Sequence, residues 1–320
     1  MGHSSGEPGF AGALQAGDKA RLAAFPKADR HCHSIFGASL QSIQAWVGVP
    51  IEPPPPRMRD FDEMRTYSHR ALYPHIYNRA GFERTAGSAI LEAIEDGVRI
   101  LEMSLDVNFI QFYSDGTTGI TGFIGFIQRL RETSSGRIDF RPEIGVSKNR
   151  DPSPQIARAM ECVDSGVFTS IDLYGNEHAR EPEDYAELYR RAAGRGLKLK
   201  AHVGEFGDAR HVERTLRALG LHEIQHGVAA AGSTSLLNLL RTEGIRLNVC
   251  PSSNVALSAA ADLAHHPIRT LVSSGVRVSI NSDDKTIFGK STTDEYLGLF
   301  RAGTLTAPEL EAIRLDSLQD

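Results

Sequence analysis

The sequence predicts a (β/α)8 TIM barrel with a helical insertion after the first strand. Three observations support this fold class. Strand-like runs alternate with amphipathic helical patterns from about residue 88 onward, there are eight strand-like runs, and a length of 320 residues suits one barrel domain over residues 1–320. Open doubly wound sheets commonly have fewer strands, so eight favour a closed barrel.

Each predicted strand is a short run rich in β-branched and apolar residues. All but the first are followed closely by a helical pattern, and such alternation implies parallel strands. The helix over 88–97 is expected to end at Gly97, because glycine readily adopts the left-handed conformation that stops a helix. The predicted strands cover 25–33, 98–105, 137–146, 167–175, 197–205, 221–227, 245–254 and 276–284, and further helices cover 154–166 and 181–196 and begin near Asp208, Ser233 and His265.

The segment 38–87 does not fit the alternation. It contains four consecutive prolines at 53–56 and a run rich in histidine and tyrosine at 66–82. We interpret it as a helical lid inserted between the first and second strands, where it would cover one mouth of the barrel.

Composition limits the function classes. Apolar residues make up 41% and charged residues 23%, which are ordinary globular values. The net charge of -5 gives no electrostatic footprint for nucleic acid or for an anionic membrane surface. No run of about 18 apolar residues is present, so no membrane span is expected. A small-molecule substrate remains compatible with this charge, and the sequence does not indicate the oligomeric state.

Cysteine usage and the amino terminus favour a cytoplasmic protein. Cys32, Cys162 and Cys250 are widely spaced and cannot all pair, so a reducing compartment is the simpler interpretation. Residues 1–10 lack the basic and apolar regions of a secretory signal.

Candidate metal ligands lie at strand ends, where barrels of this class place their active sites. His31 and His33 end the first predicted strand, and side chains at i and i+2 share one face about 6.6 Å apart. Neutral imidazole binds zinc, iron, nickel or copper. The alternative is a pair of rim histidines bonded to the backbone.

The other candidates end later strands. His202 ends the fifth and is followed by Glu205, whose alternative role is that of a carboxylate at a helix N-terminus. His226 ends the sixth. Asp283 and Asp284 follow the eighth, where a solvated turn or helix cap is the alternative. Consecutive residues point to different sides, so one aspartate would bind metal and the other would contact substrate. Convergence of all these residues at one rim favours a mononuclear metal site.

Six ordered motifs then show a family resemblance. FPKADRHCH, IDLYGNE, HVGE, IQHG, CPSSN and SINSDDKTIF resemble motifs of the adenosine deaminase family within the amidohydrolase superfamily, collinearly from about residue 25 to the end. The resemblance implies one zinc ion per chain, because the fourth strand offers no lysine for a carbamate bridge. It implies zinc ligands His31, His33, His202 and Asp283; a proton donor, Glu205; a residue orienting the attacking water, His226; and ring-nitrogen contacts from the Gly175 amide and Asp284.

The sequence departs from the family on the substrate side. Ile35 stands where relatives have an aspartate that contacts ribose, Ser104 replaces an arginine, and Lys285 replaces a proline. We expect these changes to alter substrate recognition, because unpaired buried hydroxyls are costly. The aromatic residues of this region would either line the altered pocket by stacking or pack the lid helices; they are Phe36, Trp46, Tyr67, Tyr73 and Tyr77.

The functional hypothesis is a zinc-dependent hydrolase that acts on C–N bonds in cyclic amidines. It would deaminate adenosine or a related aminopurine or nucleoside and release ammonia. One alternative keeps the zinc barrel but acts on another heterocycle, an ester or an amide. A second alternative is a barrel without activity that binds a ligand or partner, although a binding module gains little from a complete set of catalytic groups.

Overall fold

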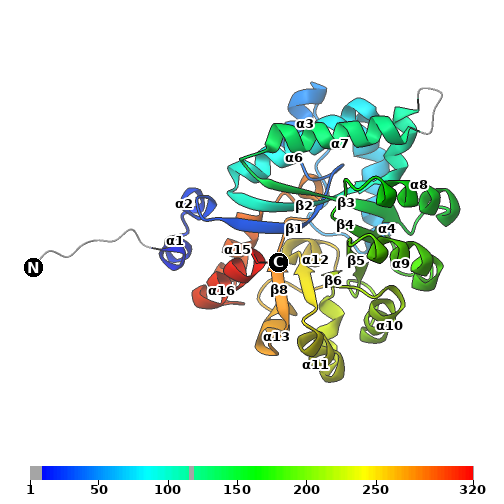
Figure 1. The fold of residues 1–320 in the computed structure, drawn as a ribbon. Helices are drawn as coiled ribbons and strands as arrows, with labels where there is room; N and C mark the ends of the chain where they lie inside the picture. Colours follow the sequence, from blue (N-terminus) through cyan, green and yellow to red (C-terminus); the bar gives the residue numbers. More distant parts are fainter. Residues whose placement is uncertain (1–8, 115–118, 320) are drawn as a thin grey trace, which may run out of the picture.

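All eight predicted strands are present in the computed structural model, which describes residues 9–114 and 119–319. They form one parallel sheet in chain order, so the predicted barrel class is confirmed (Figure 1). The expectation for the amino-terminal segment concerns residues 1–10, of which residues 1–8 lie outside the described residues. The strands are β1 (Lys27–His33), β2 (Val98–Asp106), β3 (Asp139–Ser147), β4 (Ser170–Tyr174), β5 (Lys198–Val203), β6 (Glu223–His226), β7 (Arg246–Val249) and β8 (Arg277–Ile280).

Helices surround the sheet, and several begin where the sequence predicts. Asp208 and Ser233 each cap a helix by accepting a backbone N–H, and Gly97 has a φ of 77° just after α6. The predicted helix over 181–196 is divided into η3 and α9. The helical elements are α1 (Phe10–Ala16), α2 (Lys19–Ala23), α3 (Leu40–Val47), α4 (Phe61–Tyr67), η1 (Ser68–Leu72), α5 (Tyr73–Ile76), α6 (Arg79–Glu95), η2 (Val107–Tyr113), α7 (Ile120–Ser134), α8 (Pro152–Asp164), η3 (Pro182–Tyr185), α9 (Ala186–Gly194), α10 (Ala209–Leu219), η4 (Val228–Gly232), α11 (Thr234–Glu243), α12 (Pro251–Ala256), α13 (Ile268–Ser273), α14 (Lys285–Phe288), α15 (Thr292–Arg301) and α16 (Ala307–Ser317).

The barrel closes between β8 and β1 at the site end. A single parallel bridge joins Cys32 to Asp283, and the Asp283 N–H donates to the His31 carbonyl over 3.0 Å. The closing contact therefore holds two candidate site residues at a fixed spacing through the backbone.

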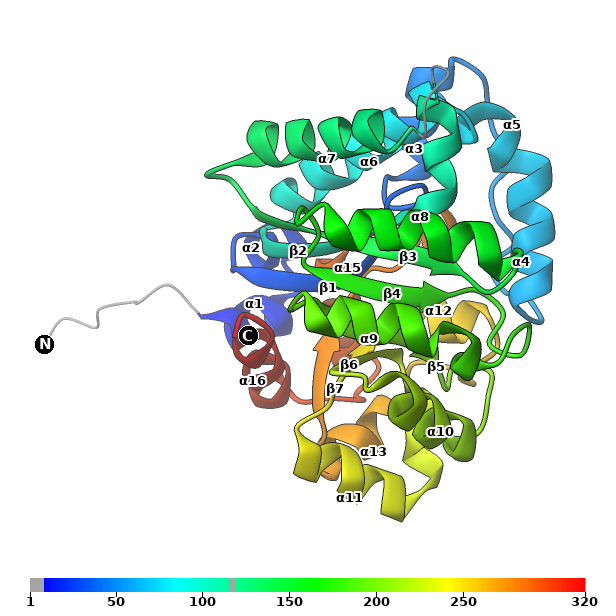
Figure 2. The ribbon, with the colours of Figure 1, turned by 45° about the vertical axis from the view of Figure 1, so that its right-hand side comes forward.

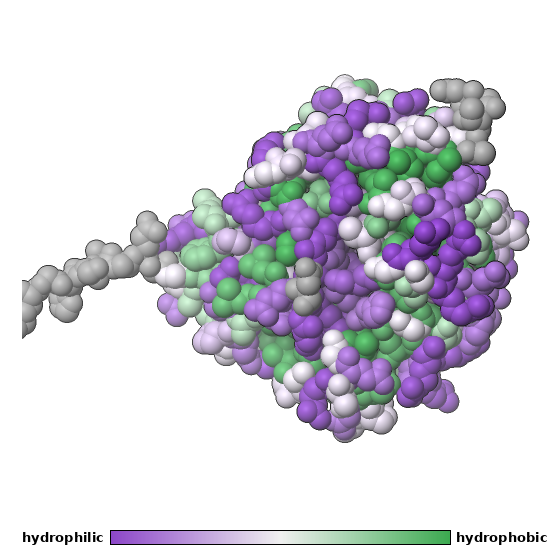
Figure 3. All heavy atoms as spheres, viewed as in Figure 1, coloured by the Kyte–Doolittle hydropathy of each residue, from purple (hydrophilic) through white to green (hydrophobic). Residues whose placement is uncertain are grey.

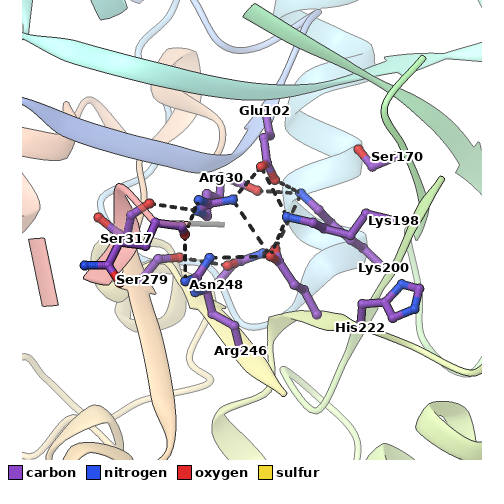
Figure 4. Close-up of polar contacts among 12 residues, drawn as sticks. Arg30, Glu102, Ser170, Lys198, Lys200, His222, Arg246, Asn248, Ser279 and Ser317 are labelled. Atoms are coloured by element: carbon purple, nitrogen blue, oxygen red, sulfur yellow. Dashed lines mark hydrogen bonds and ion pairs between the residues drawn. The ribbon is translucent and has the colours of Figure 1, made fainter. Parts of the chain in front are cut away.

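A buried ion network fills the barrel interior below the site. Lys200 Nζ contacts Glu102 and lies 2.8 Å from Glu143, and Arg30 Nη1 lies 2.6 Å from Glu102. Figure 4 shows the Arg30, Glu102 and Lys200 side chains converging inside the barrel. Burial opposes the charge on Lys200, but the surrounding carboxylates outweigh it and raise its pKa. Lys200 and His202 alternate with Ala201 on β5, so both point inward, one to the network and one to the cavity.

The segment 38–87 forms α3, α4, η1 and α5, and α6 begins within it at Arg79 and continues to Glu95. Figure 2 shows α4 and α5 on the side toward which the strand arrows of β3 and β4 point. This is the end of the barrel where the strands finish and where the candidate residues lie. The lid function of this segment stays a prediction.

Hydrophobic and hydrophilic residues are interspersed on the face shown in Figure 3. The large apolar side chains that are exposed among the described residues are Val49, Leu91 and Leu315, on three different parts of the chain. Within residues 9–114 and 119–319, no helix combines the length and the apolar character that crossing a membrane requires.

Candidate active site

The polar residues that end β1, β5, β6 and β8 meet in one cavity of about 280 Å³ at the carboxyl end of the barrel. His31 does not line this cavity, but its ring centroid lies 4.6 Å from those of His202 and His226, which do. The other seven predicted site residues line the cavity: His33, Gly175, His202, Glu205, His226, Asp283 and Asp284. The structure thus brings all eight together.

Three histidines offer ring nitrogens to a common centre. The candidate ligand atoms of His31, His33 and His202 lie within 4.8 Å of one another. His33 Nε2 and His202 Nε2 are 3.2 Å apart. Asp283 Oδ1 lies 3.7 Å from both His31 Nε2 and His33 Nε2, so a carboxylate oxygen joins the same cluster.

Hydrogen bonds on the far side of two rings determine which nitrogen is free. The Asn248 carbonyl can only accept, so His31 Nδ1, at 3.3 Å, carries the ring proton. His31 Nε2 then has a lone pair, and it is buried without a hydrogen-bond partner. His202 Nδ1 lies 3.0 Å from Asp172 Oδ1 and donates to it, which leaves Nε2 as an acceptor. Such outer hydrogen bonds are typical of histidines that ligate metals.

These residues fit a divalent metal ion. Burial is the largest cause that lowers the pKa of His33 and of His202 to about 3, and burial also lowers the pKa of His31 well below its usual range, so the rings are neutral and able to coordinate. His33 Nε2 and His202 Nε2, which are 3.2 Å apart, are close enough to bind one cation together. Three imidazoles and one carboxylate form a donor set suited to zinc.

Glu205 and His226 lie beside the cluster and contact each other. His226 Nε2 is 3.4 Å from Glu205 Oε2 and 3.8 Å from Asp283 Oδ2. Burial, followed by the charges of Asp283 and Glu177, raises the pKa of Glu205 well above its usual range. A carboxyl group held protonated in this way can donate a proton to a bound molecule.

A second carboxylate positions the loop that carries Glu205. Glu177 is 1% exposed, and it accepts backbone N–H groups from four consecutive residues after β5. Its Oε1 accepts from Glu205 and Phe206 over 2.7 and 2.8 Å, and its Oε2 accepts from Gly204 and Gly207 over 2.7 and 3.3 Å. The backbone at Glu205 therefore depends on one buried side chain.

Two candidate residues have left-handed backbone conformations. His226 has a φ of 62° and Asp283 a φ of 59°, although neither is glycine. This conformation is uncommon for residues with a Cβ atom and is often found at functional sites. At these strand ends it turns both side chains toward the cluster.

Gly175 and Asp284 form another part of the wall. Gly175 has a φ of 101°, and an added Cβ would lie 2.1 Å from Asn149 Oδ1, so this position requires glycine. Asp284 Oδ1 is buried without a hydrogen-bond partner. Burial and the neighbouring Asp283 raise the pKa of Asp284, which suits it to pair with a ring nitrogen of a ligand.

The outer wall is largely aromatic and apolar. Phe36, Tyr73 and Tyr77 line the cavity, and the Tyr73 ring stacks on both of the others at centroid distances of 5.9 and 4.8 Å. Trp46 and Tyr67 are not among the lining residues, so for these two the packing alternative holds.

Of the three residues that depart from the family pattern, two line the cavity and one does not. Ile35 and Ser104 line the cavity, and the Ser104 hydroxyl is buried without a partner. Lys285 is not a lining residue. Its Nζ lies 2.5 Å from Glu92 Oε2 on α6, and its effect on substrate recognition stays a prediction.

Sequence reasoning missed four polar residues that support the site. Asp172, Glu177 and Asn254 belong to the quoted motifs IDLYGNE and CPSSN, and a carboxylate within the apolar run of β4 was a signal for Asp172. His266 has no local signal, because only the fold brings it to Asn254.

The chain is similar to several known proteins. The family model for adenosine deaminase matches residues 144–320. A putative adenosine/adenine deaminase of Treponema pallidum (strain Nichols) is 34% identical over 288 residues, which are 90% of this chain and 95% of that protein.

Solved structures share the fold. The crystal structure of adenine deaminase from Arthrobacter aurescens has a TM-score of 0.76 at 24% identity and covers 92% of this chain and 93% of its own. A zinc-bound amidohydrolase from Burkhoderia ambifaria has a TM-score of 0.72 at 20% identity, with 95% and 87% covered. On the family match and the extent of the Treponema similarity, the chain belongs to the adenosine deaminase family.

Proposed function

We propose that this protein is a zinc-dependent hydrolytic deaminase that removes the amino group of an aminopurine and releases ammonia. The observation that carries the proposal is a carboxyl group of raised pKa, Glu205, beside a cluster of three neutral histidines and Asp283 in one cavity. The substrate class is that of the relatives, which are named adenine or adenosine/adenine deaminases.

His31, His33, His202 and Asp283 would hold one zinc ion. When bound there, zinc acts as a Lewis acid and lowers the pKa of water to about 7. Three features of the cluster support this ligand set: the lone pair of His31 Nε2 without a partner, the two facing Nε2 atoms, and the Asp283 oxygen near both His31 and His33.

Side chains and one backbone amide of the protein would donate the proton, orient the water and bind the ring. Glu205 gives its proton to the ring nitrogen next to the carbon that carries the amino group, which makes that carbon electrophilic. His226 and Asp283 hold the attacking water on one face of the ring. The Gly175 amide and Asp284 bind other ring nitrogens and orient the ring. Water adds to the carbon, the amino group leaves as ammonia, and a carbonyl remains.

The segment 38–87 would act as the lid of this single domain. Its residues Phe61, Met64 and Tyr73 line the cavity, so closure over the ring would exclude water from the reacting atoms. The amide hydrogens of this segment should exchange more slowly when a purine is bound.

The test is ammonia release from adenine, adenosine and other aminopurines by zinc-loaded protein. Glu205→Gln removes the proton donor and should lower kcat by about 10²–10⁴-fold while zinc content stays at one per chain. The matched control is Glu187→Gln, the same change at an exposed position of α9, which should keep full activity. Full turnover by Glu205→Gln would remove it as the acid. Hydrolysis of esters or amides, with no ammonia from any aminopurine, would contradict the proposed reaction.

A further inference from the structure

One buried amide lies between the two groups that flank the metal cluster. Asn254, on α12, is fully buried. Its Nδ2 lies 3.0 Å from Glu205 Oε1 and 3.1 Å from His226 Nδ1. An amide nitrogen can only donate, so if Nδ2 faces these atoms, both of them accept.

His266 indicates which way that amide faces. It precedes α13 and is 1% exposed. Its Nδ1 accepts the backbone N–H of Ile268 over 3.1 Å, so a neutral ring carries its proton on Nε2. Burial lowers the pKa of His266 to about 4, which keeps the ring neutral. His266 Nε2 lies 3.3 Å from Asn254 Oδ1 and therefore donates to it. A flipped amide would place two N–H groups against each other.

The state of His226 follows from this orientation. Because His226 Nδ1 accepts from Asn254, the proton of the neutral ring is on Nε2, the nitrogen 3.4 Å from Glu205 Oε2. A nitrogen that accepts a hydrogen bond carries no proton, so this contact itself requires the neutral ring. If the proton were on Nδ1 instead, His226 Nε2 would carry a lone pair and could not donate a hydrogen bond to a bound water.

We propose that Asn254 and His266 are a positioning pair that holds His226 as the Nε2–H tautomer and fixes the orientation of the Glu205 carboxyl. Neither residue lines the cavity. They act through His226 and Glu205, which do line it. Their effect on turnover rests on the proposed function.

The tautomer can be measured without any substrate. In protein labelled with 15N-histidine, two-bond 1H–15N spectra distinguish Nδ1–H from Nε2–H rings, and the His226 signals are identified by their loss in His226→Gln. The native protein should show His226 as Nε2–H. Asn254→Asp replaces the donor with an acceptor of the same shape, so the His226 proton should move to Nδ1. Native protein with an Nδ1–H ring, or an unchanged ring in Asn254→Asp, would overturn the proposal.

His266→Gln and a matched control separate this effect from general destabilisation. His266→Gln removes the ring that orients the amide and should weaken the preference of His226 for Nε2–H. His222 also accepts a backbone N–H through Nδ1, from Leu199 over 2.9 Å, but it precedes β6, the strand that His226 ends, and so lies at the other end of that strand. His222→Gln should leave the His226 signals unchanged, and an equal change in both variants would contradict the pair.

Kinetics then connect the pair to catalysis. Asn254→Asp should lower kcat by about 100-fold, the scale of a lost acid–base contribution, with a smaller change in KM. If the spectra behave as expected but no aminopurine releases ammonia, the positioning pair stands and the proposed function fails. If ammonia is released and the His226 tautomer does not respond to Asn254, the proposed function stands and the pair fails.

Discussion

Glu177→Gln should weaken both the fold and the site. The carboxylate accepts four backbone N–H groups, two on each oxygen. A glutamine has one acceptor oxygen, so its NH2 group must face one pair of donors. Two bonds to a charged acceptor are lost, and at about 1.5–3 kcal/mol each the free energy of unfolding should fall by about 3–6 kcal/mol. This is a large fraction of the stability of a typical domain, about 5–15 kcal/mol.

Urea unfolding followed by circular dichroism measures this loss, and steady-state kinetics measure the displacement of Glu205. The matched control is Glu213→Gln on α10, where the carboxylate pairs at the surface with Arg217. Its unfolding midpoint should hardly change, because exposed ion pairs contribute little. A loss below about 1 kcal/mol in Glu177→Gln would refute the assignment of these four bonds as strong.

Further predictions concern the metal, the acid and the ring-binding wall. His202→Ala should lose bound metal by elemental analysis, and Asp172→Asn, which replaces the charged acceptor of His202 Nδ1 with a neutral one, should weaken metal affinity about 10–100-fold in chelator competition. Because the pKa of Glu205 is raised, kcat should begin to fall at a higher pH than it would with an ordinary glutamate as the acid; a fall centred near the ordinary glutamate pKa of about 4.3 would contradict the raised pKa. Gly175→Ala forces a Cβ to 2.1 Å from Asn149 Oδ1 at a φ of 101°, so it should lower thermal stability and raise KM together.

The fold and the family were predictable because their signals are local. β1 ends at His33, β5 at Val203 and β6 at His226, close to the predicted boundaries, and Gly97 stops its helix as expected. Alternation of strand and helix leaves few topologies open, so eight such units suffice to indicate a barrel. The resemblance to the adenosine deaminase family is confirmed.

The substrate side was less predictable. Of five aromatic candidates, only Phe36, Tyr73 and Tyr77 reach the cavity, and Lys285 pairs with Glu92 and does not line it. These outcomes depend on how the segment after β1 packs over the barrel. No periodicity in the segment 38–87 specifies that packing.

The sequence by itself determined the barrel, the family and the set of residues whose chemistry suits a metal and a proton donor, because periodicity and residue type are properties of the chain. Only the tertiary structure decided which imidazole nitrogens are free, why the pKa of Glu205 is raised and which groups the Asn254 amide contacts. The reason is that these properties come from burial and from hydrogen bonds between residues far apart in sequence. Asp172 and His202 are 30 positions apart, and Asn254 and Glu205 are 49 apart.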